Sequence, residues 1–124
     1  MSDELYKEFI LDLYRNPLNK KRLDDFDIEQ NGSNPSCGDD VNIQIKFGQD
    51  KKIEDIGYQG QGCAILEAST SLLTDEAKGK SKEEIMNLKE EDIIKLLGVN
   101  IIYTRKKCAL LGLKTLQEAI KKYV

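Results

Sequence analysis

The stretch 41–47, VNIQIKF, alternates apolar and polar residues at every step. A period of two is the pattern of a half-buried β-strand, with apolar side chains on one face and polar ones on the other. Phe26 and Ile28 alternate with charged residues in the same way, and residues 53–59 (IEDIGYQ) follow a glycine-containing turn. The sequence therefore predicts a small antiparallel meander of three strands with one wet face, and a loop over residues 31–36 between the first two strands.

A helix is predicted before this strand region. Apolar residues recur at i, i+1, i+4 and i+5 between Leu5 and Tyr14, which places them along one side of a helix. We expect this helix to run from Asp3 to Arg15. It ends at Asn16-Pro17, because proline disfavours the helical conformation of the residue before it.

The second half of the chain is predicted to be helical. One helix begins at Cys63, directly after a Gly-Gln-Gly turn whose glycines let the backbone pass sharply from strand into helix. Ser81 and Glu84 match a capping box for a short helix. Two further amphipathic patterns follow, over Ile93–Leu97 and over Leu110–Ile120.

This order of elements predicts the α+β class: a small antiparallel three-stranded sheet packed against helices, with an N-terminal helix and a helical C-terminal half. The chain has 124 residues, enough for one hydrophobic core and too few for two. We therefore expect a single domain over residues 1–124.

Composition excludes several functions. There are 19 Lys plus Arg against 22 Asp plus Glu, a formal charge of −3, so no global basic field favours nucleic acid or anionic lipid. The sequence contains no His, which excludes Ser-His-Asp and Cys-His catalysis. The N-terminus lacks the profile of a signal peptide, and no apolar run reaches the roughly 20 residues that span a bilayer. We expect a cytoplasmic protein with no nucleic-acid or membrane partner.

The three cysteines, Cys37, Cys63 and Cys108, stand at predicted element boundaries. An odd number cannot pair completely within the chain, which favours a reducing compartment. One interpretation is that they are small, inert, buried residues. The other is a shared metal or sulfur site, because three thiolates and the carboxylate of Asp39 make a tetrahedral set for zinc or four terminal ligands for a small iron–sulfur cluster.

Cys108 carries a further expectation. A thiol at a helix N-terminus beside Arg105, Lys106 and Lys107 should have a lowered pKa and therefore more of the nucleophilic thiolate. We expect Cys37 and Cys108 to lie on exposed boundaries, which makes both candidates for accepting sulfur as a persulfide.

At these residues the sequence resembles the iron–sulfur cluster assembly family of IscU, SufU and the N-terminal part of NifU. The resemblance rests on residues 34–39 (NPSCGD), 60–65 (GQGCAI), 68–71 (ASTS) and 107–111 (KCALL), and residues 14–17 (YRNP) extend it over nearly the whole chain. It implies a compact α+β domain that receives sulfur from a pyridoxal-phosphate cysteine desulfurase. Such a domain assembles a [2Fe–2S] cluster or relays the sulfur onward, and zinc often occupies the same site.

The resemblance also implies a ligand set. Cys37, Cys63 and Cys108 match the three cysteines of the family, and Asp39 matches its aspartate. A carboxylate oxygen is a weaker partner for iron than a thiolate, which suits a cluster that must leave. These four residues are therefore the predicted ligands of zinc, iron or a [2Fe–2S] cluster.

Three features bear on the branch of the family. Lys107 stands where the IscU branch has a ligand-capable His, and the SufU branch has Lys there. Cys63 and Cys108 are 45 positions apart, a spacing that resembles IscU, because SufU-type chains usually carry an insertion. Residues 100–104 (NIIYT) replace the Leu-Pro-Pro-Val-Lys stretch of the IscU branch, which speaks against recognition by a dedicated Hsp70 pair.

The leading hypothesis is an iron–sulfur cluster assembly scaffold rather than a metabolic enzyme. Its expected partners are a cysteine desulfurase and apo iron–sulfur client proteins or a downstream scaffold. A zinc-dependent sulfurtransferase, favoured by Lys107, is a related alternative and makes the protein an enzyme. A structural zinc adaptor without sulfur chemistry and a metal-free interaction domain with buried cysteines are the rivals from other classes.

Overall fold

The computed structural model describes residues 3–36, 38–98 and 105–123, with side chains from Glu8 onward. In chain order the elements are α1 (Asp3–Arg15), β1 (Ile28–Asn34), β2 (Asp39–Phe47), β3 (Ile53–Gln61), α2 (Ala64–Ala77), α3 (Lys82–Met86), α4 (Glu90–Leu97) and α5 (Lys106–Lys122). The predicted order and the bounds of the first helix are confirmed. None of the described helices is long and apolar enough to cross a membrane.

The sheet has the predicted meander topology, with strand order β1-β2-β3 and antiparallel pairing throughout. The predicted loop over residues 31–36 was too long, because residues 31–34 belong to β1 and pair with residues 39–42. Gly32 faces α5, and a Cβ atom there would collide with Thr115 Oγ1. The Asn-Gly pair that indicated a loop instead supplies the small residue over which α5 passes.

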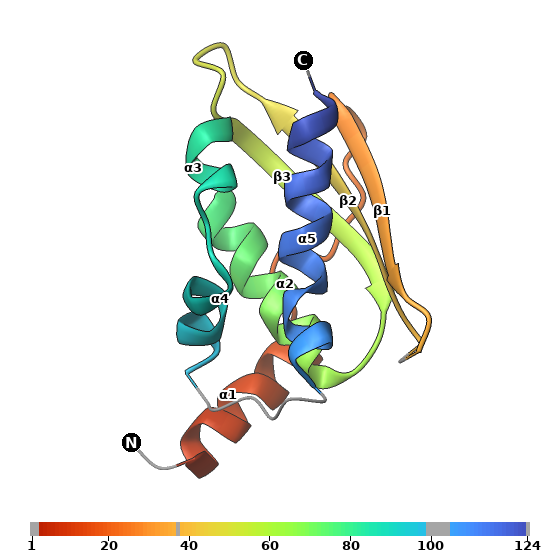
Figure 1. Ribbon diagram of the computed structural model, residues 1–124, viewed down its shortest axis with the longest axis vertical. Coiled ribbons are helices and arrows are strands. Elements are labelled where there is room, and N and C mark those ends of the chain that lie inside the picture. Colours follow the sequence, from red (N-terminus) through yellow and green to blue (C-terminus); the bar gives the residue numbers. More distant parts are fainter. Residues whose placement is uncertain (1–2, 37, 99–104, 124) are drawn as a thin grey trace.

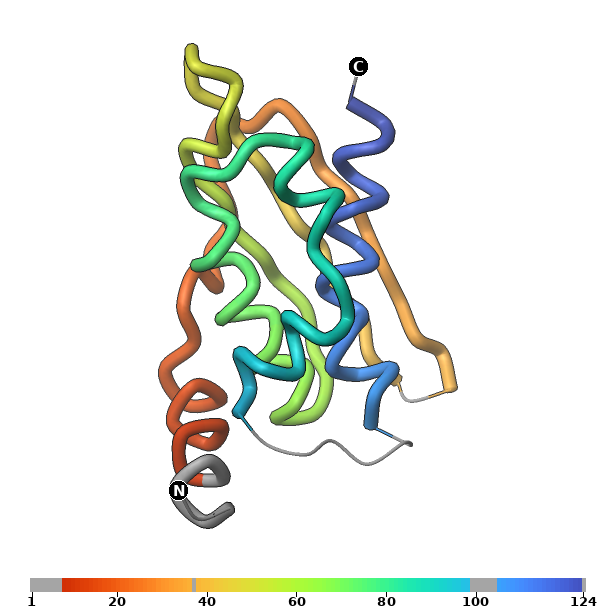
Figure 2. The backbone as a smooth tube through the Cα atoms, turned by 60° about the vertical axis from the view of Figure 1, so that its left-hand side comes forward, coloured from red at the N-terminus to blue at the C-terminus, as the bar shows by residue number. Residues whose placement is uncertain are grey.

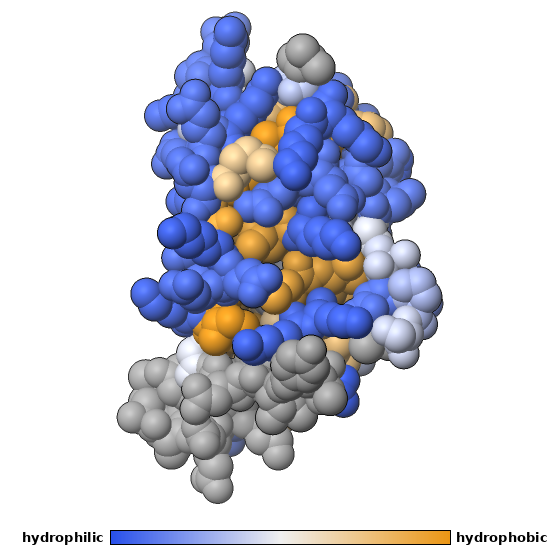
Figure 3. Space-filling view, in the orientation of Figure 1, coloured by the Kyte–Doolittle hydropathy of each residue, from blue (hydrophilic) through white to orange (hydrophobic). Residues whose placement is uncertain are grey.

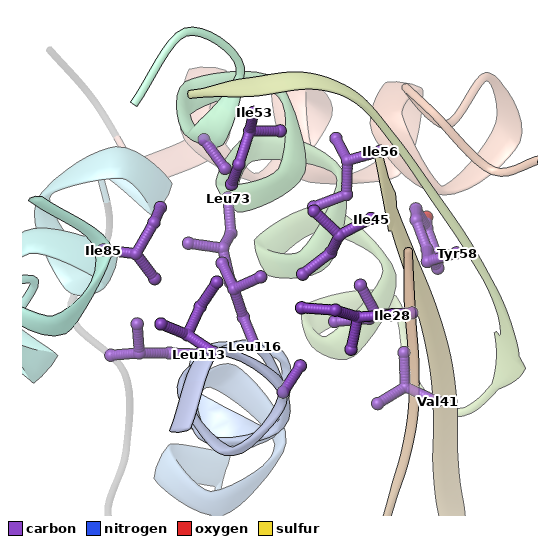
Figure 4. Packing of buried hydrophobic residues seen from close by; sticks show 14 of the residues in the cluster. Ile28, Val41, Ile45, Ile53, Ile56, Tyr58, Leu73, Ile85, Leu113 and Leu116 are labelled. Atoms are coloured by element: carbon purple, nitrogen blue, oxygen red, sulfur yellow. The ribbon is translucent and has the colours of Figure 1, made fainter. Parts of the chain in front are cut away.

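The helices cover one face of the sheet, with α2 over β3 and α5 over β1 and β2 (Figure 1). Between these two layers lies the main core, in which Ile45 and Ile56 from the sheet meet Leu73 of α2 and Leu116 of α5 (Figure 4). All four are at most 1% exposed. The alternation that predicted the strands therefore sorts side chains to the core as expected.

Helix α1 lies at one end of the helical layer (Figure 1 and Figure 2). Its buried side chains Ile10 and Leu13 pack against Ala68 of α2, Leu97 of α4 and Ala109 of α5. These contacts form a second, smaller cluster close to the start of α5.

The other face of the sheet is only partly wet, contrary to the prediction. The segment after α1 lies across it: Leu23 N donates to Gln44 Oε1 at 3.4 Å, and Tyr58 N donates to Asn19 O at 3.0 Å. Gln44 is fully buried as a result. At Gly57 a Cβ atom would collide with Lys21 O, so the glycine allows this close approach. The sequence pattern alone does not reveal such a cover, because the segment is mostly polar.

A buried polar network ties the same segment to α2. Tyr58 Oη lies 3.0 Å from Glu67 Oε2 and 2.9 Å from Ser71 Oγ, and Lys20 Nζ lies 2.7 Å from Glu67 Oε1. Leu18 N also donates to Ser71 Oγ at 3.2 Å. Burial raises the pKa of Tyr58, and the charge of Glu67 adds to the effect. The network fixes the first turns of α2 against β3, and with them the position of Cys63.

Replacing Tyr58 with Phe removes one hydroxyl from this network and leaves Glu67 and Ser71 short of a partner. We expect Tyr58→Phe to lower the free energy of unfolding by about 1–3 kcal/mol, the range for a buried polar group left unsatisfied. Denaturant unfolding measures this. Tyr14→Phe is the control, because Tyr14 is 49% exposed. Equal stability of the two variants would contradict the structural role of the network.

The caps of the short helices follow the sequence. Glu84 N donates to Ser81 Oγ at 3.2 Å and Ser81 N donates to Glu84 Oε1 at 3.1 Å, which confirms the predicted capping box. Helix α4 begins at Glu90, three residues before the expected Ile93, and ends at Gly98 in the left-handed region with φ of 73°. Glycine is favoured at such a helix end.

Candidate metal centre

Three chain segments meet at one end of the molecule, where β2, α2 and α5 all begin (Figure 1). Asp39 is the first residue of β2, Cys63 directly precedes α2, and Cys108 lies in the first turn of α5. One carboxylate oxygen of Asp39 and the sulfur atoms of the two cysteines all lie within 4.8 Å of one another. Residues 24 and 45 positions apart in the sequence thus form one cluster of metal-binding atoms.

The cluster is largely shielded from water. Asp39 is 3% exposed and Cys108 1%, while Cys63 is half-buried. Asp39 Oδ2 has no hydrogen-bond partner among the residues that the structure describes. A buried carboxylate oxygen without a partner is costly, and a bound cation removes that cost. The two thiols and the carboxylate therefore fit a metal such as zinc or iron.

The Gly-Gln-Gly stretch, whose first two residues end β3, makes room for the cluster. A Cβ atom on Gly62 would lie 2.6 Å from Asp39 Oδ1 and would collide with Leu66 Cδ2. Gly60 has φ of 148°, and a Cβ there would collide with Asp40 O. The sequence predicted a sharp turn here; the structure adds that the second glycine lets the carboxylate stand beside Cys63.

Arg105 lies next to the two thiols. The negative charge of Cys63 as a thiolate is the main cause that raises the pKa of the Arg105 guanidinium, and a hydrogen bond to Cys108 adds to it. From the sequence, Arg105 was predicted only as a cation beside Cys108. Its three-residue spacing from Cys108, which puts both on one side of the helix start, was the available signal.

The expectations for the Cys108 environment were wrong. Cys108 is buried rather than exposed, and burial raises the pKa of its thiol, with hydrogen bonds to Asp39 and Cys63 and their charges adding to the rise. The basic neighbours that suggested a lowered pKa, Lys106 and Lys107, are exposed. Desolvation and the neighbouring Asp39 and Cys63 therefore outweigh the helix N-terminus in setting the direction of the pKa shift.

Cys37 lies outside the described residues, as do residues 100–104, so their predicted roles stay predictions. Gly38, between Cys37 and Asp39, has φ of 71°. Glycine adopts this left-handed conformation without the steric cost that a side chain would bring.

The NifU-like N terminal domain family matches residues 5–124. The chain belongs to this family. A relative named zinc-dependent sulfurtransferase SufU, from Bacillus subtilis (strain 168), is 34% identical over 97% of this chain and 92% of its own. A relative named iron–sulfur cluster assembly scaffold protein IscU, from Streptococcus pyogenes serotype M1, is 37% identical over 97% of this chain and 85% of its own.

Solved structures agree with this family. The crystal structure of FiSufU from Fervidobacterium islandicum AW-1 has a TM-score of 0.78 and 32% identity, and the match covers 97% of this chain and 99% of that one. The alignments with the SufU of B. subtilis and the IscU of S. pyogenes both run over 137 positions. Both alignments are longer than the 124 residues of this chain. Extra length relative to this chain therefore does not distinguish the relative named SufU from the relative named IscU.

The glycine at 62 gives a testable link between packing and metal binding. In Gly62→Ala the new methyl group displaces the Asp39 carboxylate, and we expect zinc affinity to fall by about 10–100-fold, the range for disturbing a ligand's support. Competition with a chromophoric chelator measures the affinity. Gly48→Ala is the matched control, since its nearest neighbour is the flexible end of Asp50 at 3.1 Å. Unchanged zinc affinity in Gly62→Ala would mean that Asp39 does not contribute to metal binding.

Proposed function

We propose that the protein is an iron–sulfur cluster assembly scaffold in which Cys37, Asp39, Cys63 and Cys108 hold iron or a transient [2Fe–2S] cluster. The observation that carries the proposal is the convergence of Asp39, Cys63 and Cys108 within 4.8 Å in a buried, partly unsatisfied cluster. Membership of a family whose relatives include scaffold proteins supports it.

The donor set suits a cargo that is held and then released. Thiolates are the ordinary ligands of iron–sulfur clusters, whereas the hard oxygen of Asp39 is a weaker partner for iron. Cluster loss can therefore begin at the carboxylate. Arg105 beside the two thiols offsets part of the negative charge that the site carries when its ligands are deprotonated.

Sulfur reaches the site by thiol exchange. A scaffold thiolate attacks the outer sulfur of a persulfide on the donor enzyme; a new S–S bond forms on the scaffold, the donor's S–S bond breaks, and the donor cysteine leaves as a thiolate. No net oxidation occurs. Cys37 and Cys108 are the proposed acceptors. Attack by Cys108 requires the first turn of α5 to open, because this thiol is 1% exposed.

A zinc-dependent sulfurtransferase is the alternative, supported by Lys107 and by the relative of that name from B. subtilis. In that case Asp39, Cys63 and Cys108 would hold zinc, which would keep the thiolates deprotonated and ready to accept sulfur. For either function we propose a cysteine desulfurase as sulfur donor, apo iron–sulfur proteins or a downstream scaffold as acceptors, and a cytoplasmic location.

The deciding experiment is alanine release by a cysteine desulfurase under anaerobic conditions, titrated with zinc-loaded, metal-free and ferrous-loaded protein. The scaffold proposal expects zinc to inhibit, and it expects the ferrous form to build a coloured cluster when dithiothreitol in the assay reduces the persulfide sulfur to sulfide. Stimulation by the zinc form alone would support the sulfurtransferase. If no form responds and chelation unfolds the chain in a thermal melt, the protein is a structural zinc adaptor.

Cys108→Ser tests the most buried ligand. Serine is nearly isosteric, but its hydroxyl is a poor ligand for zinc and iron, so we expect loss of metal retention, of sulfur acceptance, or of both. Metal content after gel filtration and the mass of the persulfidated protein are the two measurements. Circular dichroism checks that the variant keeps its fold. Retention of both properties would remove Cys108 from the site.

A further inference from the structure

A groove of about 640 Å³ runs along the outward side of α5, between the end of β1 and the start of α4. Leu110 and Leu113 contribute to its apolar lining, and Lys107, Lys114 and Lys121 contribute basic side chains. Figure 3 shows this side of the molecule, where apolar side chains form a band between polar side chains on both sides. We call this feature the α5 groove.

The three lysines form a regular row. They are spaced by seven residues, which returns to nearly the same side of a helix after two turns, so successive lysines lie about 10 Å apart along α5. All three are exposed. Within the part of the chain that the structure describes, the ion pairs use other cations, including Lys20, Lys21 and Lys80. The row is therefore available to acidic groups of another molecule.

The charge of the groove contrasts with that of the protein. The chain carries a formal charge of −3, yet four lysines and two glutamates line the groove. A local positive row on an acidic protein attracts a negative surface without a general affinity for polyanions. The apolar lining adds a second requirement, because a purely ionic partner would leave the half-buried Leu110 uncovered.

One end of the groove lies at the start of α5, the helix that also carries Cys108, although none of Asp39, Cys63 and Cys108 lines the groove. Lys107, at one end of the row, directly precedes Cys108 in the first turn of α5. A protein seated along the groove therefore stands beside the site. Since the cluster of ligands is largely buried, transfer into or out of it needs a partner held at close range.

We propose that the α5 groove docks an acidic amphipathic helix of a partner protein that exchanges sulfur or a cluster with the metal centre. This proposal rests on the proposed function for what the partner exchanges with the site. The acidic and apolar character of the partner helix is inferred from the groove alone. The helix presents Glu or Asp residues at a spacing of seven to the lysine row and apolar residues to the half-buried Leu110.

The test uses a synthetic Glu/Leu amphipathic helical peptide, with binding followed by fluorescence anisotropy and mapped by backbone amide NMR. We expect shifts at α5, weakening with added salt, and a loss of about tenfold in affinity for the double variant Lys114→Glu/Lys121→Glu. Lys78→Glu/Lys95→Glu is the matched control. It changes the net charge equally, and both lysines are exposed and outside the groove.

Three outcomes would overturn the proposal: equal loss in the control variant, equal binding of a peptide with Gln in place of every Leu, or equal binding of a single-stranded oligonucleotide or anionic vesicles. The first means unspecific charge attraction, the second means that the apolar lining does not contribute to binding, and the third means that the lysine row binds any polyanionic surface. Zinc content is measured in both variants and is expected to stay unchanged. A failure of docking is thereby distinguished from a failure of the metal centre.

Discussion

The close packing of α5 between β1 and α2 is the constraint on which the structure depends. On one side Thr115 lies against Gly32, where any side chain would collide, and on the other a Cβ on Gly112 would lie 2.9 Å from Thr70 Oγ1. Two glycines on different elements thus set how near the helix can come to its neighbours. This distance fixes the register of α5, and the register decides that Cys108 faces Asp39 and Cys63.

Much of the fold could be predicted from the sequence, because its signals are local. The alternation at 41–47, the exit of the first helix at Asn16-Pro17 and the capping box at Ser81 depend only on nearby residues, and all three hold in the structure. The extension of β1 through Gly32 and the cover over Gln44 could not be predicted in this way. Both are decided by contacts with segments distant in sequence.

The same distinction between local and long-range contacts applies to what could be predicted of the site. Asp39, Cys63 and Cys108 could be named from their types and positions, and the structure brings them together. The pKa direction at Cys108 could not, because it depends on which neighbours share its buried surroundings. The lysines next to it in sequence point outward, whereas the acidic neighbours that raise its pKa come from β2 and from the start of α2. The groups that affect the pKa of Cys108 are therefore not its neighbours in the sequence.

The wide separation of the site residues along the chain also sets the order of events during folding. The meander and α2 bring Asp39 and Cys63 together through contacts of moderate sequence separation, but Cys108 joins only when α5 docks on both of them. Contacts of long range form late, because the loop that they close costs chain entropy before they contribute. During synthesis the shorter nascent chain therefore exposes an incomplete set of ligands. Emergence of α5 from the ribosome is then the step that brings Cys108 to Asp39 and Cys63 and completes the candidate site.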